Sequence, residues 1–136
     1  MRQTFWALIF AVAASTIAAA ANQIYLTDAI KNPSYLRSLT GLLKNADKLP
    51  IWSRQVLNTS GNYVGTPGAY STVDGIRYEL FYACKAHDCA DNAMELMFAP
   101  QGAKVWGAIV IDGKSVAYLG APDAAQRAAL KEALQR

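Results

Sequence analysis

The sequence predicts an α+β domain: an antiparallel β-sheet meander flanked by an N-terminal and a C-terminal helix, with a disulfide-closed protruding loop. Three observations lead to this expectation. Apolar residues recur at helical spacing after residue 33 and again after residue 123, and residues 76–83 show the two-residue alternation of a strand. The connections between the expected strands are short, which is typical of antiparallel neighbours. Helices segregated from such a meander define the α+β class.

The N-terminal segment, residues 1–21, is predicted to be a secretory signal peptide that does not belong to the fold. Arg2 precedes an uncharged, largely apolar run of 17 residues that ends in four alanines, and this ending fits an A-x-A cleavage signal. A membrane anchor is the less favoured alternative, because the run is at the short limit for crossing a bilayer. Residues 22–136 would then fold as one exported, periplasmic domain with no membrane association.

The first expected helix begins at Asn32-Pro33, where asparagine can cap the helix and proline suits its first position. Its apolar stripe is formed by Tyr35, Leu36, Leu39, Leu42 and Leu43. Lys48-Leu49-Pro50 ends this helix, because the residue before a proline resists helical geometry. Ile51 and Trp52 follow and are expected to pack into the core.

Four or five short strands are expected after a loop at residues 58–69. They cover residues 70–73, 76–83, 93–99, 104–111 and 115–119. Asp74-Gly75 and Asp112-Gly113 are strong two-residue hairpin turns, and Pro100-Gln101-Gly102 forms a further turn. One face of the second strand carries Ile76, Tyr78, Leu80 and Tyr82. Residues 120–123 lead into the closing helix, whose apolar positions include Leu130 and Leu134.

The charge pattern argues against nucleic acid as a partner. The chain has 13 Lys and Arg residues against 10 Asp and Glu residues, a net charge of +3. Removal of Arg2 with the signal peptide leaves 12 basic residues against the same 10 acidic ones, so the charge falls to about +2. The charges are scattered without a run of like sign. Because nucleic-acid binding needs a clustered basic face, we expect no nucleic-acid partner.

The two cysteines, Cys84 and Cys89, are predicted to form a disulfide. Export brings the chain into an oxidising compartment, where disulfides form and persist, and two cysteines allow one intrachain pairing. For a six-residue ring, the loop-entropy model gives a stabilisation on the order of 2 kcal/mol. The larger effect is local, because the bond removes most of the conformational freedom of the residues between the cysteines.

His87 is the chain's one histidine, and it lies inside this ring. A zinc site with Cys84, Cys89 and Asp88 is disfavoured, because the ring is too tight for both sulfurs and the imidazole to converge. A catalytic Cys–His pair is disfavoured because it needs a free thiolate. The residues favour a rigid protruding loop with an exposed histidine, although composition alone favours a plain hairpin staple over a binding role. No metal, cofactor or enzymatic activity is predicted.

The segment Cys84-Lys85-Ala86-His87-Asp88-Cys89 resembles the hallmark loop Cys-Lys-Pro-His-Asp-Cys of the inhibitor of vertebrate lysozyme (Ivy) family. Lys48-Leu49-Pro50-Ile51-Trp52 is similar to the family's Lys-Leu-Pro-x-Trp after the first helix. Residues 74–84 resemble the strand that leads into the loop, and Asp112-Gly113-Lys114 with Tyr118-Leu119 resembles the final hairpin. The resemblance covers most of residues 25–120, and the loop is its most specific part.

The resemblance implies a periplasmic inhibitor of C-type lysozyme that inserts the loop into the active site. His87 would bond to the two catalytic carboxyl groups, Asp88 would orient His87 or the loop backbone, and Lys85 would reach an acidic rim of the cleft. The disulfide would pre-order the loop, which lowers the entropy lost on binding. Ala86 stands where the family has proline, and we expect it to leave the unbound loop somewhat looser.

The resemblance also leaves a second hypothesis. Most C-type lysozymes are strongly basic, and a domain near +2 lacks overall charge complementarity with them. The alternative is a family member without lysozyme inhibition, which acts on the cell's own lytic transglycosylases or as a structural envelope protein. A homodimer is a further possibility that the resemblance allows.

Overall fold

The computed structural model of the chain describes residues 24–58 and 60–136. The expected signal peptide at residues 1–21 lies outside the described residues. Within the described ranges, no helix combines the length and the apolar character needed to cross a membrane.

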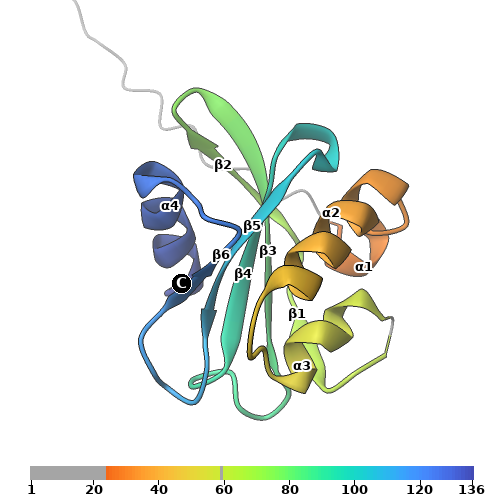
Figure 1. Cartoon of the computed structure of the whole chain (residues 1–136), viewed down its shortest axis with the longest axis vertical. Coiled ribbons are helices and arrows are strands. Elements are labelled where there is room, and N and C mark those ends of the chain that lie inside the picture. Colours follow the sequence, from red (N-terminus) through yellow and green to blue (C-terminus); the bar gives the residue numbers. More distant parts are fainter. Residues whose placement is uncertain (1–23, 59) are drawn as a thin grey trace, which may run out of the picture.

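Six antiparallel strands form one sheet at the centre of the molecule (Figure 1). They are β1 (Tyr63–Gly65), β2 (Ala69–Val73), β3 (Ile76–Lys85), β4 (Ala93–Phe98), β5 (Val105–Val110) and β6 (Ala117–Leu119). The spatial order is β1-β3-β4-β5-β6. Both β1 and β2 pair with β3, each along a different part of that strand. β2 pairs with its first half, where Val73 lies opposite Ile76, and β1 pairs with its last residues, where Tyr63 lies opposite Lys85. The predicted antiparallel meander is confirmed.

Helices cover both faces of this sheet, which confirms the predicted α+β class (Figure 1). One face is covered by α1 (Leu26–Ala29), α2 (Pro33–Asn45) and α3 (Ile51–Arg54), and the other by α4 (Ala124–Leu134). Two short 3₁₀ helices complete the fold, η1 (Gln55–Leu57) and η2 (Pro100–Gly102). Because both faces are covered, all six residues of β4 are buried.

Alternate residues of the strands supply two separate cores. Phe81 and Ala83 of β3 pack with Leu39 of α2 on one face. Tyr78 and Leu80 of the same strand pack with Leu130 of α4 on the other. This division follows from the two-residue period of a strand, which sends successive side chains to opposite faces.

Local sequence signals set the starts of the two long helices at the predicted places, whereas α2 ends at Asn45, earlier than the predicted end at Lys48-Leu49-Pro50. The Asn32 side chain accepts a hydrogen bond from the Ser34 backbone N–H at 2.9 Å, and proline occupies the first position of α2. At α4, the Asp123 carboxylate accepts from the Gln126 backbone N–H, and the Gln126 side-chain oxygen accepts from the Asp123 N–H. This reciprocal pair is a capping box, which satisfies two otherwise unpaired N–H groups.

The two predicted Asp-Gly turns are also confirmed. Asp74 and Gly75 have φ values of 50° and 78°, and Asp112 and Gly113 have φ values of 52° and 67°. Positive φ at both central residues is the requirement of a type I′ turn, which Asp and Gly satisfy more readily than other residues. The two turns lie at opposite ends of the sheet (Figure 1).

Several details of the sequence interpretation are wrong. Residues 58–69 were expected to be a loop, but they contain β1, which is held by backbone pairing to β3. Ile51 is 78% exposed, while Trp52 is 4% exposed, because successive helical side chains point about 100° apart and α3 buries one of them. Leu36 lies at the margin of the α2 stripe and is 41% exposed, and Ile76 adjoins a turn and is 46% exposed.

Candidate functional site

The predicted disulfide between Cys84 and Cys89 is present and closes the loop that joins β3 to β4. Cys84 is buried at the end of β3, whereas Cys89 is exposed. The loop therefore has one anchor in the sheet and one at the surface. Because both sulfurs are used in the bond, neither is available as a zinc-ligating thiolate or as a nucleophile.

The tip of the loop is a four-residue turn, and His87 is its third residue. The Asp88 backbone N–H donates to the Lys85 carbonyl oxygen at 3.0 Å. His87 has a φ of 64° and is exposed, as predicted. Positive φ at the third position is the pattern of a type II turn, whose second position favours proline. A left-handed backbone costs a residue other than glycine about 1 kcal/mol, and such strain is concentrated at functional sites.

Ala86, the second residue of the turn, attaches the loop to the neighbouring edge strand. Its backbone N–H donates to the carbonyl oxygen of Asn62, directly before β1, at 3.1 Å. A proline has no N–H and could not form this bond. The backbone freedom that alanine adds is therefore offset by an attachment that a proline at this position would lack.

The far side of the loop is held by a group of three side chains, Asp88, Asn92 and Asp112, which we call the brace. Asn92 is 2% exposed, and its Nδ2 donates to Asp88 Oδ2 at 2.8 Å and to Asp112 Oδ1 at 3.4 Å. Its Oδ1 accepts from the Asp112 backbone N–H at 3.1 Å. The Gly113 N–H also donates to the Asp91 carbonyl oxygen at 2.9 Å. The loop and the Asp112-Gly113 turn are therefore one connected unit.

Lys85 makes one weak charge contact within the loop. Its Nζ lies 3.8 Å from Asp88 Oδ2, and the two side chains are 39% and 38% exposed. A surface pair of this kind contributes less than about 1 kcal/mol. Lys85 is therefore available for a partner, while the Asp88 carboxylate is held by Asn92.

The charge at this end of the molecule differs from the charge of the whole chain. Residues 85–92 and 111–114 carry two lysines, Lys85 and Lys114, against three aspartates, Asp88, Asp91 and Asp112. The net charge of these residues around His87 is therefore −1, although the net charge of the whole chain is +3. Surface charges act over about one Debye length, about 8 Å at physiological salt, so a docked partner responds to this local balance.

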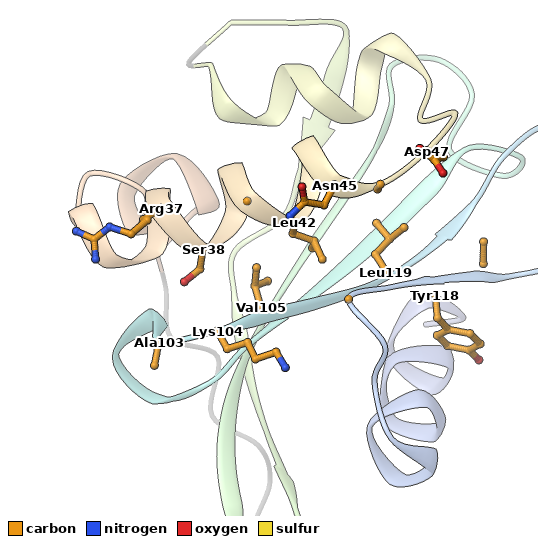
Figure 2. Close-up of a pocket in the computed structure, with 14 residues that line it drawn as sticks. Arg37, Ser38, Leu42, Asn45, Asp47, Ala103, Lys104, Val105, Tyr118 and Leu119 are labelled. Atoms are coloured by element: carbon orange, nitrogen blue, oxygen red, sulfur yellow. The ribbon is translucent and has the colours of Figure 1, made fainter.

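A pocket of about 620 Å³ lies between α2 and strands β5 and β6, and it does not include the loop (Figure 2). Leu42, Val105 and Leu119 line it, and the Arg37 guanidinium points away from it. Its lining has no histidine or cysteine. No three His, Cys, Asp or Glu side chains converge as a metal site in the part of the chain that the structure describes.

Glu95 is a titratable residue that the sequence interpretation did not single out. It lies on β4, faces α4, and is 4% exposed beside a pocket of about 290 Å³ that Tyr82 and Arg136 also line. Burial raises the pKa of Glu95 to about 8, against a smaller lowering by the Arg136 guanidinium. In the sequence, Glu95 is recognisable as the single acidic residue in the apolar run of residues 93–99. Its burial could not be predicted from that run, because it depends on α4.

A small sheet domain that presents an exposed polar side chain on a closed, hydrogen-bonded loop has the features of a protein-binding module. The sequence model of the inhibitor of vertebrate lysozyme (Ivy) family matches residues 43–136, more than half of the chain, and this region includes the loop and α4. The chain therefore belongs to the Ivy family, and the predicted family membership is confirmed.

A relative with a curated sequence adds to this comparison. An uncharacterized protein of Yersinia pestis is 31% identical over 83 residues, which are 60% of this chain and 50% of that protein. The chain thus matches about half the length of this relative.

Proposed function

We propose that this protein is exported and inhibits a C-type lysozyme by inserting the loop of residues 84–89 into the two-carboxylate active site. The observation that carries the proposal is the exposed His87 at the tip of a closed loop, in a chain of the Ivy family. The loop is anchored on three sides, by the disulfide, by the Ala86 bond to Asn62 and by the brace.

The chemistry of the imidazole suits a pair of carboxyl groups in different protonation states. A glycosidase of this type has one protonated acid and one ionised carboxylate a few ångström apart. A neutral imidazole has one N–H donor and one nitrogen acceptor on opposite sides of its ring. His87 can therefore donate to the ionised carboxylate and accept from the protonated acid, with no net charge transferred into the cleft.

The loop's rigidity supports the proposal energetically. Association loses rotamer and backbone freedom in every residue that becomes ordered, and a loop that is already ordered loses less. Here the disulfide and the brace fix the backbone around His87 before any partner arrives. We assign Asp88 to holding the loop, and Lys85 to the rim of the partner's cleft.

The local charge favours a basic enzyme as the partner. The three aspartates around the loop, Asp88, Asp91 and Asp112, outnumber the two lysines, which gives the docking end the sign opposite to that of a basic lysozyme. Complementary charge raises the association rate, and added salt reduces that gain. Residues 1–21 would direct export to the periplasm, where such an enzyme attacks the cell wall.

A second candidate function is supported by the overall charge. An exported domain of about +2, with 12 basic against 10 acidic residues, is repelled at long range by a strongly basic enzyme. This favours a less basic target that cleaves the same glycan, such as the cell's own lytic transglycosylases, or a structural role in the envelope. Measurement of inhibition against both enzyme classes separates the candidates.

The test is a cell-wall hydrolysis assay with the purified protein that begins after residue 21, against basic and near-neutral C-type lysozymes and lytic transglycosylases. We expect inhibition of a C-type lysozyme, and we expect His87→Ala to remove most of it. Asp74→Ala is the matched control, because Asp74 is also exposed and has a φ of 50° in a turn at the other end of the sheet. Equal inhibition by the parent and by His87→Ala contradicts the loop mechanism.

A further inference from the structure

Asn92 lies outside the six-residue loop, yet it bonds to the loop through both its backbone and its side chain. Its backbone carbonyl oxygen accepts from the Lys85 N–H at 3.0 Å, and its N–H donates to the Asp88 carbonyl oxygen at 3.0 Å. Its side chain bonds to Asp88 on the loop and to Asp112 on the next turn. Asn92 itself is 2% exposed, so the Asn92 end of these bonds is shielded from water, while Asp88 is half-buried and Asp112 is exposed.

The disulfide cannot position the tip without this support. It fixes the distance between residues 84 and 89, but the exposed Cys89 and Ala90 connect the loop to β4 through surface chain. A ring with one surface anchor can still pivot about its buried end at Cys84. The contacts to Asn92 hold the other side, because they connect Asp88, the residue directly after His87, to the sheet and to the Asp112-Gly113 turn.

The geometry requires an amide at this position. One end of the side chain must donate to two carboxylates, and the other end must accept from a backbone N–H. Asparagine provides both within one short side chain. Aspartate has the same shape, but it would lose both donated bonds and place a third carboxylate against Asp88 and Asp112. Leucine or alanine would form none of these bonds and would leave the loop without its connection to the Asp112 backbone.

We infer that Asn92 is the positioning residue of the inhibitory loop, and that through it the Asp112-Gly113 turn sets the orientation in which His87 meets its target. This inference rests on the proposed function for its effect on inhibition. Its effect on the loop itself can be measured on the protein alone, without any target.

The test compares Asn92→Asp with the matched control Asp91→Asn. The control changes the charge of the adjacent residue but keeps the hydrogen bond from the Gly113 N–H to the carbonyl oxygen of residue 91. Amide hydrogen exchange is measured at Lys85, Asp88 and Asp112, with β4 and β5 amides as the internal reference. We expect Asn92→Asp to accelerate exchange at Lys85 and Asp88 by about tenfold and to weaken inhibition by a similar factor, with the β4 and β5 amides little changed. The Asp112 amide should stay protected, because a carboxylate oxygen at residue 92 still accepts its hydrogen bond. The control should leave the exchange rates unchanged. Because it removes one of the three aspartate charges at the docking end, any loss of inhibition that it causes should disappear on addition of salt, whereas the loss in Asn92→Asp should not.

A rescue variant separates positioning from simple loss of stability. In the double variant Asn92→Asp with Asp112→Asn, the donor and acceptor exchange places, and the new amide can donate to the new carboxylate. We expect it to recover part of the loop protection and part of the inhibition. Uniform acceleration across the sheet, or unchanged exchange at Lys85 and Asp88 in Asn92→Asp, would overturn the inference. If the parent inhibits no enzyme, the proposed function fails, and the exchange data still decide this inference.

Discussion

Glu95→Gln is the substitution whose effect on stability can be worked out most fully from the structure. Glu95 lies in the central strand β4, opposite Tyr82 on β3 and Ala108 on β5, and it is 4% exposed. Burial disfavours the charged carboxylate and raises its pKa from 4.5 to about 8. Glutamine has nearly the same shape and stays neutral at every pH, so it removes the titration with little change in packing.

The sign follows from proton binding. Between the unfolded pKa of 4.5 and the folded pKa of about 8, the folded protein keeps a proton that the unfolded chain has released. The contribution of Glu95 to the free energy of unfolding is therefore greatest at low pH and falls by up to about 1.4 kcal/mol per pH unit through this window. The parent should lose a few kcal/mol in total from this one group, and above about pH 8 the loss levels off.

The assay is urea unfolding of the parent and the variant at intervals from about pH 5 to about pH 9. Near pH 5 the two free energies of unfolding should nearly agree, and by pH 8 the Glu95→Gln variant should be the more stable. Glu132→Gln is the matched control, because Glu132 is an exposed carboxyl on the same helix that covers Glu95. A difference between parent and Glu95→Gln that is constant across the pH range refutes the reasoning.

Three further substitutions test the backbone geometry. His87→Gly removes a left-handed non-glycine residue, so we expect the free energy of unfolding to rise by about 0.5–1 kcal/mol in urea melts while inhibition is lost; a fall in stability contradicts this. Gly102→Ala places a Cβ against the ring of Tyr35 at a φ of 68°, and thermal melts should show a loss on the order of 2–3 kcal/mol. Gly41→Ala, with nothing within 4 Å of its added Cβ, should instead stabilise α2 by up to about 1 kcal/mol, and a loss at Gly41 equal to that at Gly102 would point to a general intolerance of the helix layer.

The parts of the fold that could be predicted are those set by neighbouring residues. Asn32-Pro33 caps α2, and the two Asp-Gly pairs form turns with the φ values that the residue types favour. The Cys84–Cys89 ring is also local, because its two halves are five residues apart in sequence. Each of these features depends on a backbone preference or a chemical bond that acts over a few residues.

The parts that could not be predicted depend on residues far apart in the chain. β1 forms because Tyr63, Val64 and Gly65 pair with the end of β3, and no alternation of polar and apolar residues marks it. Asn92 is recognisable as part of the site only when Asp112, 20 residues later, is placed beside it. Whether a lone acid such as Glu95 is solvated or buried depends on which face α4 covers, and one sequence does not fix that.

The arrangement at the loop has a consequence for engineering. Its supporting hydrogen bonds come from backbone groups and from the side chains of Asp88, Asn92 and Asp112, and within the described residues none of them uses the imidazole of His87. Ala86 contributes only its backbone N–H to the support of the loop. The side chains of Ala86 and His87 can therefore be varied together in a library, while the disulfide-closed ring and its supporting bonds are left unchanged. The domain could therefore serve as a scaffold for displaying short grafted sequences against other enzyme clefts.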